Sequence, residues 1–320
     1  MTTHRERIQA TLQGETPDQT PVALWRHFPV DDQWPETLAA AQIAYQRAYD
    51  FDLVKVTPAS SFCLRDWGAE DEWRGNPEGT RQYTRPVITQ PQDWERLPVL
   101  APSAPHLAGQ LACLHQMRAA LGPQVPMLQT VFNPLAQAKN LAGQNTLLVH
   151  LRKYPEAVMK GLQTISVTTR NFVEAACETG IDGVFYAVQH AQAALLTEEE
   201  SRQFNHGLDL KILEAAQGLW CNMLHLHGMD VYFEQLAKYP LQIINWHDRE
   251  TPPSLADAQK VFGGTLCGGL SRDTLVYKTS QDVRLEKEEA IRQTGGKHLI
   301  LSTGCVVPVI APHGNIMAAK

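Results

Sequence analysis

The sequence predicts a (β/α)8 barrel, an α/β fold in which parallel strands alternate with helices. Two observations predict it. Short apolar runs alternate along the chain with longer stretches of helical character, which is the pattern of parallel βα units. Eight such runs occur within 320 residues, and this number favours a TIM barrel over a doubly wound open sheet, the alternative fold. Because no low-complexity tract or charge run divides the chain, we expect a single domain over residues 1–320.

The expected strands are runs rich in apolar and β-branched residues, bounded by turn-forming residues. In chain order they are PVALWR (21–26), DLVKVTP (52–58), PMLQTVF (126–132), DGVFYAVQ (182–189), NMLHLHG (222–228), LQIINWH (241–247), GTLCGGL (264–270) and KHLILSTG (297–304). If all of them pair in parallel, their carboxyl ends lie on one face of the barrel.

Stretches of helical character lie between these runs, at 36–49, 147–179, 196–220, 229–238, 254–262 and 272–295. The stretch 36–49 carries apolar residues at the three-to-four spacing of an amphipathic helix. The stretch 254–262 begins with serine after two prolines, which favours a helix start, and glycine follows it, which favours a helix end. Residues 1–19 predict a short N-terminal helix. The irregular stretch 59–125 is expected to hold inserted loops and extra helices.

Composition limits the classes of function. The chain is 43% hydrophobic and 19% charged, with a net charge of −6, so it lacks the basic surplus typical of nucleic-acid binding. No apolar run approaches the roughly 20 residues of a membrane span. The six cysteines are scattered singly, as in proteins of a reducing compartment. Neither a GxGxxG nor a GxSxG motif is present. We therefore expect a cytoplasmic enzyme that acts on a small molecule, without membrane or nucleic-acid partners.

Polar side chains gather where the expected strands end, and a barrel of this class carries its chemistry there. The residues at these ends are Arg26, His27, Asn133, Tyr186, Gln189, His190, His225, His227, Asn245, His247, Asp248 and Cys305. Five of the twelve histidines fall in this set. A lone histidine is more often a hydrogen-bonded structural residue than a catalyst, so the convergence of several on one face is what predicts a site.

The segment NMLHLHGMD (222–230) carries the most specific signal. Alternation along a strand places His225 and His227 on the same face, and two neutral imidazoles on one face are a common start of a zinc site. Cys305, at the end of the last strand, would complete a His2Cys set with an open fourth position for water or substrate. The alternative is structural, with the imidazoles in ordinary core positions and Cys305 as a small buried hydrophobic residue.

Seven segments spread along the chain carry a family resemblance: RERIQATLQGETPDQTPVALWR, AYDFDLVKVTP, FNPLAQAKNLAG, ETGIDGVFYAVQHA, INWHD, LCGGL and ILSTGCVVPVIAPHGNIMA. In them the chain resembles the uroporphyrinogen decarboxylase superfamily, which includes that decarboxylase and the cobamide:thiol methyltransferases. The resemblance implies a (β/α)8 barrel. The decarboxylases carry Arg-Gln-Ala-Gly-Arg after the first strand, and its arginines hold substrate carboxylates. This chain keeps Arg26 but has Val30 in place of the second arginine, which disfavours porphyrinogen decarboxylation.

The thiol methyltransferases of this superfamily carry a zinc motif of His-x-Cys on strand five and a distant cysteine on strand eight. The resemblance places His225 at the histidine, His227 at the first cysteine and Cys305 at the second. The exchange of cysteine for histidine is a departure that leaves the metal with one thiolate fewer. The resemblance implies zinc-dependent transfer of a methyl group from a methylated corrinoid, held by a partner corrinoid protein, to a thiol.

In this hypothesis the remaining candidates support the reaction. Four are assigned to catalysis, either to orient an acidic tail of the acceptor or to support the ligands and transfer protons: Arg26, His190, His247 and Asp248. Four are assigned to substrate binding: His27, Asn133, Tyr186 and Gln189. One alternative is a metal-free decarboxylase of tetrapyrrole biosynthesis, and another is a non-catalytic barrel that binds a corrinoid or tetrapyrrole. A homodimer is compatible with the sequence.

Overall fold

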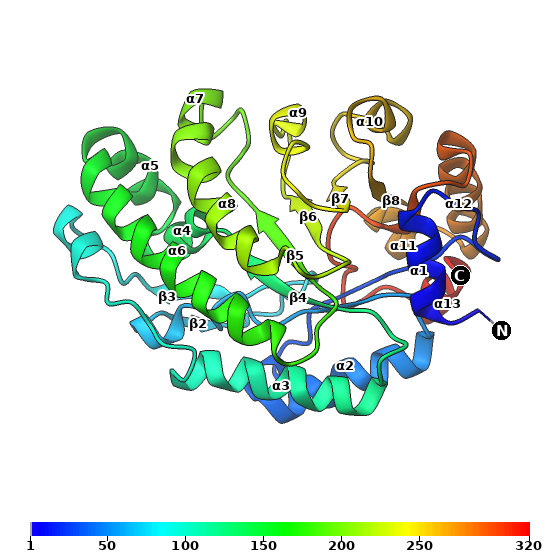
Figure 1. The fold of residues 1–320 in the computed structure, drawn as a ribbon, viewed down its shortest axis with the longest axis horizontal. Helices are drawn as coiled ribbons and strands as arrows, with labels where there is room; N and C mark the ends of the chain where they lie inside the picture. Colours follow the sequence, from blue (N-terminus) through cyan, green and yellow to red (C-terminus); the bar gives the residue numbers. More distant parts are fainter. Residues whose placement is uncertain (1) are drawn as a thin grey trace.

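A curled sheet of seven parallel strands forms the centre of the computed structural model, which describes residues 2–320 (Figure 1). The strands lie in the order β1 (Val54–Val56), β4 (Met127–Phe132), β5 (Gly183–Val188), β6 (Met223–Leu226), β7 (Ile243–Trp246), β8 (Thr265–Leu270) and β9 (Leu299–Thr303). Every residue of these strands is buried. Strands that are buried on both faces appear in a sequence as continuous apolar runs. Seven of the eight strands expected from such runs are present in the sheet and are confirmed.

The first expected strand, 21–26, is wrong as a regular strand but lies where the eighth would be. On one side Leu301 N donates to Pro21 O at 2.8 Å and Ala23 N donates to Leu301 O at 2.9 Å. On the other side Asp52 N, just before β1, donates to Val22 O at 2.9 Å. The segment therefore lies between the two edges of the sheet. It forms only an isolated bridge, Val22 to Leu301. Pro21 has no N–H, so the ladder cannot continue on the N-terminal side of this bridge.

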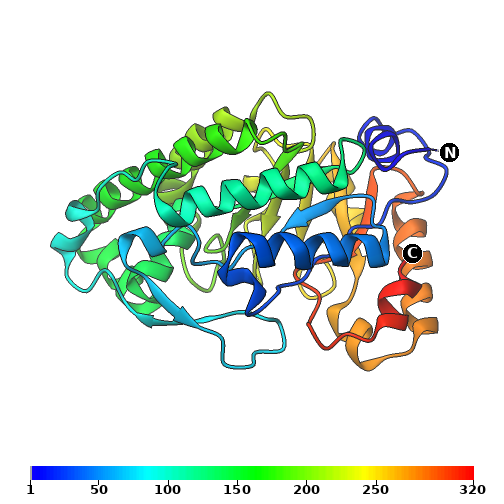
Figure 2. The ribbon, with the colours of Figure 1, turned by 90° about the horizontal axis from the view of Figure 1, so that it is seen from below.

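Helices connect successive strands and cover the outside of the sheet (Figures 1 and 2). They are α1 (His4–Leu12), α2 (Pro35–Tyr49), α3 (Pro105–Leu121), α4 (Pro134–Ala142), α5 (Gln144–Lys153), α6 (Pro155–Cys177), α7 (Glu198–Ser201), α8 (Gly207–Leu213), α9 (Phe233–Leu236), α10 (Leu255–Val261), α11 (Arg272–Tyr277), α12 (Ser280–Thr294) and α13 (His313–Ala318). The expected helix 147–179 is broken before Pro155, because proline disfavours helical backbone in the residue that precedes it. A π-helical turn, Arg202–His206, joins α7 to α8.

The stretch 59–125 holds an inserted hairpin and helix α3, as the irregular sequence predicts. The hairpin consists of β2 (Glu70–Glu72) and β3 (Gln82–Arg85), which pair antiparallel. Its loop meets the chain that follows β9, since Val309 N donates to Pro77 O at 2.8 Å. The loop therefore lies beside the carboxyl end of the sheet.

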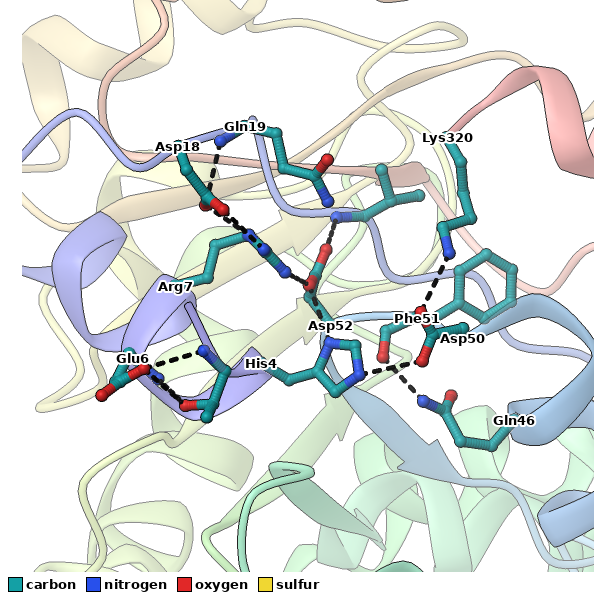
Figure 3. A network of polar contacts seen from close by, with 12 residues as sticks. His4, Glu6, Arg7, Asp18, Gln19, Gln46, Asp50, Phe51, Asp52 and Lys320 are labelled. Carbon is teal, nitrogen blue, oxygen red and sulfur yellow. Dashed lines mark hydrogen bonds and ion pairs between the residues drawn. The ribbon is translucent and has the colours of Figure 1, made fainter. Parts of the chain in front are cut away.

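A buried network fastens α1 to the sheet (Figure 3). Arg7 donates to Asp18 at 2.8 Å and forms an ion pair with Asp52. His4 Nδ1 lies 3.0 Å from Asp52 Oδ1, and Asp52 Oδ2 accepts from Val22 N at 2.9 Å. Asp52 is 1% exposed, and this one carboxylate joins the N-terminal helix, the segment 21–26 and the start of β1.

Candidate metal centre

Side chains from three strand ends meet in one cluster. His225 and His227 come from the end of β6, His247 follows β7, and Cys305 follows β9. One ligand atom of each lies within 4.8 Å of the ligand atoms of the other three, and Cys305 Sγ is 3.7 Å from His227 Nδ1. The structure thus brings together the three ligands expected from the sequence. It adds His247, which the sequence analysis assigned to catalysis.

A hydrogen bond with Asn245 fixes which ring nitrogen of His225 is free to bind a metal. Asn245 Nδ2 donates to the carbonyl oxygens of Cys267 at 2.7 Å and Thr303 at 3.1 Å. Asn245 Oδ1, 2.6 Å from His225 Nδ1, must then be the acceptor, so the proton resides on Nδ1. His225 Nε2 is left with a lone pair that can bind a metal. The ring of Phe185 stacks on this imidazole, with centroids 5.0 Å apart, and limits its rotation.

His247 is held by a carboxylate in the same manner. Its Nδ1 lies 3.2 Å from Glu250 Oε2, and Glu250 in turn accepts from Arg272 at 2.9 Å. Its Nε2 is buried and has no hydrogen-bond partner among residues 2–320. A buried polar atom without a partner is rare. A metal ion or a substrate proton at the centre of the cluster would satisfy this nitrogen, so the donor set fits a zinc site.

Burial sets the charge state of the cluster. Burial lowers the pKa of His227 to about 4. Burial also lowers the pKa of His225 well below its ordinary value, and the neighbouring imidazoles of His227 and His247 act in the same direction. Burial also acts against protonation of His247, but the charge of Cys305 and the hydrogen bond with Glu250 together leave its pKa raised. His225 and His227 are therefore neutral at pH 7, which is the form of imidazole that binds metals.

Lys55 is a buried cation near the cluster that the sequence analysis missed. Its Nζ lies 4.6 Å from the ring centroid of Phe185 and 3.4 Å from Thr57 Oγ1. Burial lowers its pKa to about 7, while the charge of Cys305 acts in the opposite direction. The signal was present in DLVKVTP, where lysine stands alone within an apolar run. The side chain of a lysine in a barrel strand can point into the barrel or extend to solvent. The side chain of Lys55 points into the barrel.

A cavity of about 380 Å³ adjoins the cluster, with His227 in its wall. Three other residues expected at the site line it, namely His27, Gln189 and His190. Side chains that the sequence analysis did not select line it as well, among them Ser60, Tyr83, Lys139 and Asn140. Lys139 and Asn140 lie in the second turn of α4, beyond the strand end at which the sequence predicts the site.

Asn133 and Tyr186 do not line this cavity. Both are fully buried: Tyr186 Oη donates to Asp209 Oδ1 on α8 at 2.7 Å, and Asn133 Nδ2 donates to Asn205 Oδ1 in the π-helical turn before α8 at 2.7 Å. The cause is strand alternation, because Phe185 faces the cluster and its neighbour Tyr186 must face the opposite side. The structure therefore gives these two residues a packing contact in place of the substrate contact expected from the sequence.

Arg26 and Asp248 also point away from the cluster. The Arg26 guanidinium lies 5.2 Å from the ring centroid of Phe28 and 5.1 Å from that of Tyr45, in a separate small cavity against α2. Asp248 Oδ2 accepts from Gly269 N at 3.0 Å, and burial raises its pKa to about 7. Both side chains follow the alternation of their segments, since His27 and His247 beside them face the site.

The family model for uroporphyrinogen decarboxylase (URO-D) matches residues 3–319, so the chain belongs to the URO-D family. The fold is similar to that of a methyltransferase from Methanosarcina mazei, with a TM-score of 0.87 at 20% identity over 100% of this chain and 97% of that one. It is also similar to a B12-independent methionine synthase from Shewanella sp. W3-18-1 in complex with selenomethionine, with a TM-score of 0.60 at 13% identity over 97% and 96%. No curated protein sequence matches the chain significantly. Among residues 2–320 no helix combines the length and apolarity of a membrane span.

Proposed function

We propose that this protein is a zinc-dependent methyltransferase that moves a methyl group from a methylated corrinoid to a thiol, on a closed (β/α)8 barrel. The observation that carries the proposal is the meeting of His225, His227, His247 and Cys305 at the carboxyl end of the sheet. The URO-D family model and a methyltransferase of the same fold support it. Methionine, the product in the second neighbour's name, is itself an S-methyl compound.

His225, His227 and Cys305 would hold the zinc ion, beside the cavity that His227 lines. When bound, zinc would supply Lewis acidity that lowers the pKa of a coordinated substrate thiol. His247 would take the thiol proton on Nε2, since that nitrogen is unpartnered and Glu250 orients the ring through Nδ1. The thiol sulfur would take the methyl group from a methylated corrinoid carried by a partner protein. The corrinoid would keep the electron pair of the broken cobalt–carbon bond and leave in its Co(I) state.

Decarboxylation of uroporphyrinogen is the competing function, and the cavity argues against it. A polycarboxylate needs several free cations, which are best supplied by arginine. Arg26 lies in a separate cavity, and Arg81, which lines the main one, is paired with Asp71 at 3.0 Å.

The test is elemental analysis of the purified protein together with a thiol-methylation assay that uses methylcobalamin. We expect about one zinc per chain, lost in His225→Ala and Cys305→Ser and retained in the control Cys177→Ser, a half-buried cysteine remote from the cluster. His247→Gln should keep the zinc and lose at least about 100-fold in rate. Protein that holds no zinc as purified and decarboxylates porphyrinogens, or zinc-loaded protein that shows no turnover with any thiol, would contradict the proposal.

A further inference from the structure

The cavity beside the cluster contains one cation that no acid balances. Glu78, in its wall, pairs with Arg272 at 2.5 Å, and Arg81 pairs with Asp71 at 3.0 Å. The ammonium group of Lys139 has neither an ion pair nor a hydrogen bond among residues 2–320, although burial lowers its pKa. A partly buried charge without a partner is unfavourable unless a ligand supplies the opposite charge.

Two further groups on the same wall lack partners. His190 is 3% exposed, and neither of its ring nitrogens has a hydrogen bond among residues 2–320. The Oδ1 atom of the Asn140 amide is buried without a partner as well. Buried polar groups in folded proteins are nearly always hydrogen-bonded. Three unsatisfied groups on one cavity wall therefore indicate that a polar ligand binds there.

The position of this wall relates it to the metal cluster. Lys139 and Asn140 lie on α4, which follows β4, and His190 follows the neighbouring strand β5. His227 belongs to the cluster and lines the same cavity, and the charge of Lys139 is one cause of the lowered pKa of both His190 and His227. A single small ligand can therefore touch the wall with one end and reach the cluster with the other.

We propose that Lys139 and His190 bind the anionic head group of the substrate, a carboxylate, sulfonate or phosphate. Lys139 supplies the opposite charge and a ring N–H of His190 donates a hydrogen bond to the anion. The Asn140 carbonyl oxygen is an acceptor, so it would be satisfied by an N–H or O–H donor elsewhere on the ligand. This wall replaces Arg26 as the residue set that orients an acidic tail. That the anion belongs to the thiol acceptor rests on the proposed function, whereas the anion site itself does not.

Calorimetric titration of the zinc-loaded protein tests the proposal with two thiols of similar size, 3-mercaptopropionate and 2-mercaptoethanol. We expect the carboxylate to bind at least about tenfold more tightly. Lys139→Gln should abolish this preference, and Lys139→Arg should restore most of it. Lys153→Gln, at the exposed end of α5, is the matched control and should change nothing. Thermal melting of each variant checks that it is folded.

Metal-free protein separates this inference from the proposed function. Propionate, methanesulfonate and inorganic phosphate are titrated in turn into the metal-free protein. If one of them binds and its binding is lost in Lys139→Gln, the anion site is supported and its preferred head group is identified. Such binding without any thiol affinity of the zinc-loaded protein would uphold the inference and contradict the proposed function. Equal affinity for the two thiols, with no anion binding in the metal-free protein, would overturn the inference while leaving thiol binding at zinc intact.

Discussion

Asn245 shows how one neutral residue can prepare a metal ligand. Its amide is fixed by two backbone carbonyls, so it cannot rotate to offer NH₂ to His225. The tautomer of His225 is therefore set before any metal arrives. Residues that hold a ligand in this way commonly affect metal affinity nearly as much as the ligands do.

Replacing this amide tests its role. Asn245→Ala should lower zinc affinity by about 10- to 100-fold, because His225 loses the acceptor that keeps the proton on Nδ1. Competition with a zinc-binding dye measures the affinity. Asn145→Ala, at an exposed position of α5, is the control. Unchanged zinc affinity in a folded Asn245→Ala variant would show that the tautomer of His225 does not depend on Asn245.

Gly79 lies in the wall of the cavity, where there is no room for a larger side chain. Its φ is +76°, and a Cβ there would lie 2.6 Å from the Cβ of His27. Gly75 has nearly the same φ, +77°, but open space around it. Gly75→Ala should cost about 1 kcal/mol in unfolding free energy from backbone strain alone. Gly79→Ala should cost about 1 kcal/mol more, since it also displaces His27. Urea unfolding of both variants measures the difference, which would vanish if the loop moves aside freely.

At the scale of elements, the sequence predicts the strands well and the direction of their side chains poorly. Parallel strands buried on both faces appear as apolar runs, so β4 to β9 could be located. Such runs carry no alternation of polar and apolar residues, and nothing in DGVFYAVQ tells which neighbour faces the site. Tyr186 was consequently expected in the site although Phe185 is there. His225 and His227 could be found because two polar residues at a spacing of two share a face.

The contact between β5 and α8 depends on a buried acid. Asp209 is fully buried and accepts from the hydroxyls of Tyr186 at 2.7 Å and Tyr239 at 2.8 Å. Burial raises its pKa from 3.8 to about 7, against the effect of these hydrogen bonds. Between about pH 4 and pH 7 the folded chain therefore holds a proton that the unfolded chain has lost. Stability contributed by this proton is present at low pH and falls as pH rises through that window.

Asp209→Asn removes this titration. From pH 5 to pH 7 the natural protein should lose roughly 2 kcal/mol of unfolding free energy relative to the variant, because the slope of about 1.4 kcal/mol per pH unit falls by half as the pH reaches the folded pKa. Urea unfolding at the two pH values gives the difference directly. A constant difference between the two proteins would show that Asp209 keeps an ordinary pKa when folded.

At the scale of the whole molecule, the edges of the sheet meet through the segment 21–26. The sequence suggested a strand there, and the structure has one isolated bridge and the carboxylate of Asp52. The sequence could not predict the ion pairs of Arg7 with Asp18 and Asp52. These three residues belong to separate segments of the chain and share no local pattern.

Asp52→Ala should destabilise the protein by about 3 kcal/mol, because it leaves the buried guanidinium of Arg7 with Asp18 alone and Val22 N without an acceptor. Glu174→Ala, which breaks an exposed pair with Arg170, should change stability by less than about 0.5 kcal/mol. Unfolding in urea compares the two. Equal effects would mean that the sheet edges are held without the Asp52 network.

The position of Cys305 has a consequence for how the protein matures. Its sulfur follows β9, which pairs with β8 and with residues near the start of the chain, whereas both imidazoles of the HLH segment sit on β6. During synthesis the growing polypeptide acquires its histidines long before its thiolate. Capture of a cation by the complete donor set can occur only after β9 has left the ribosome and has paired with β8 and with the segment 21–26.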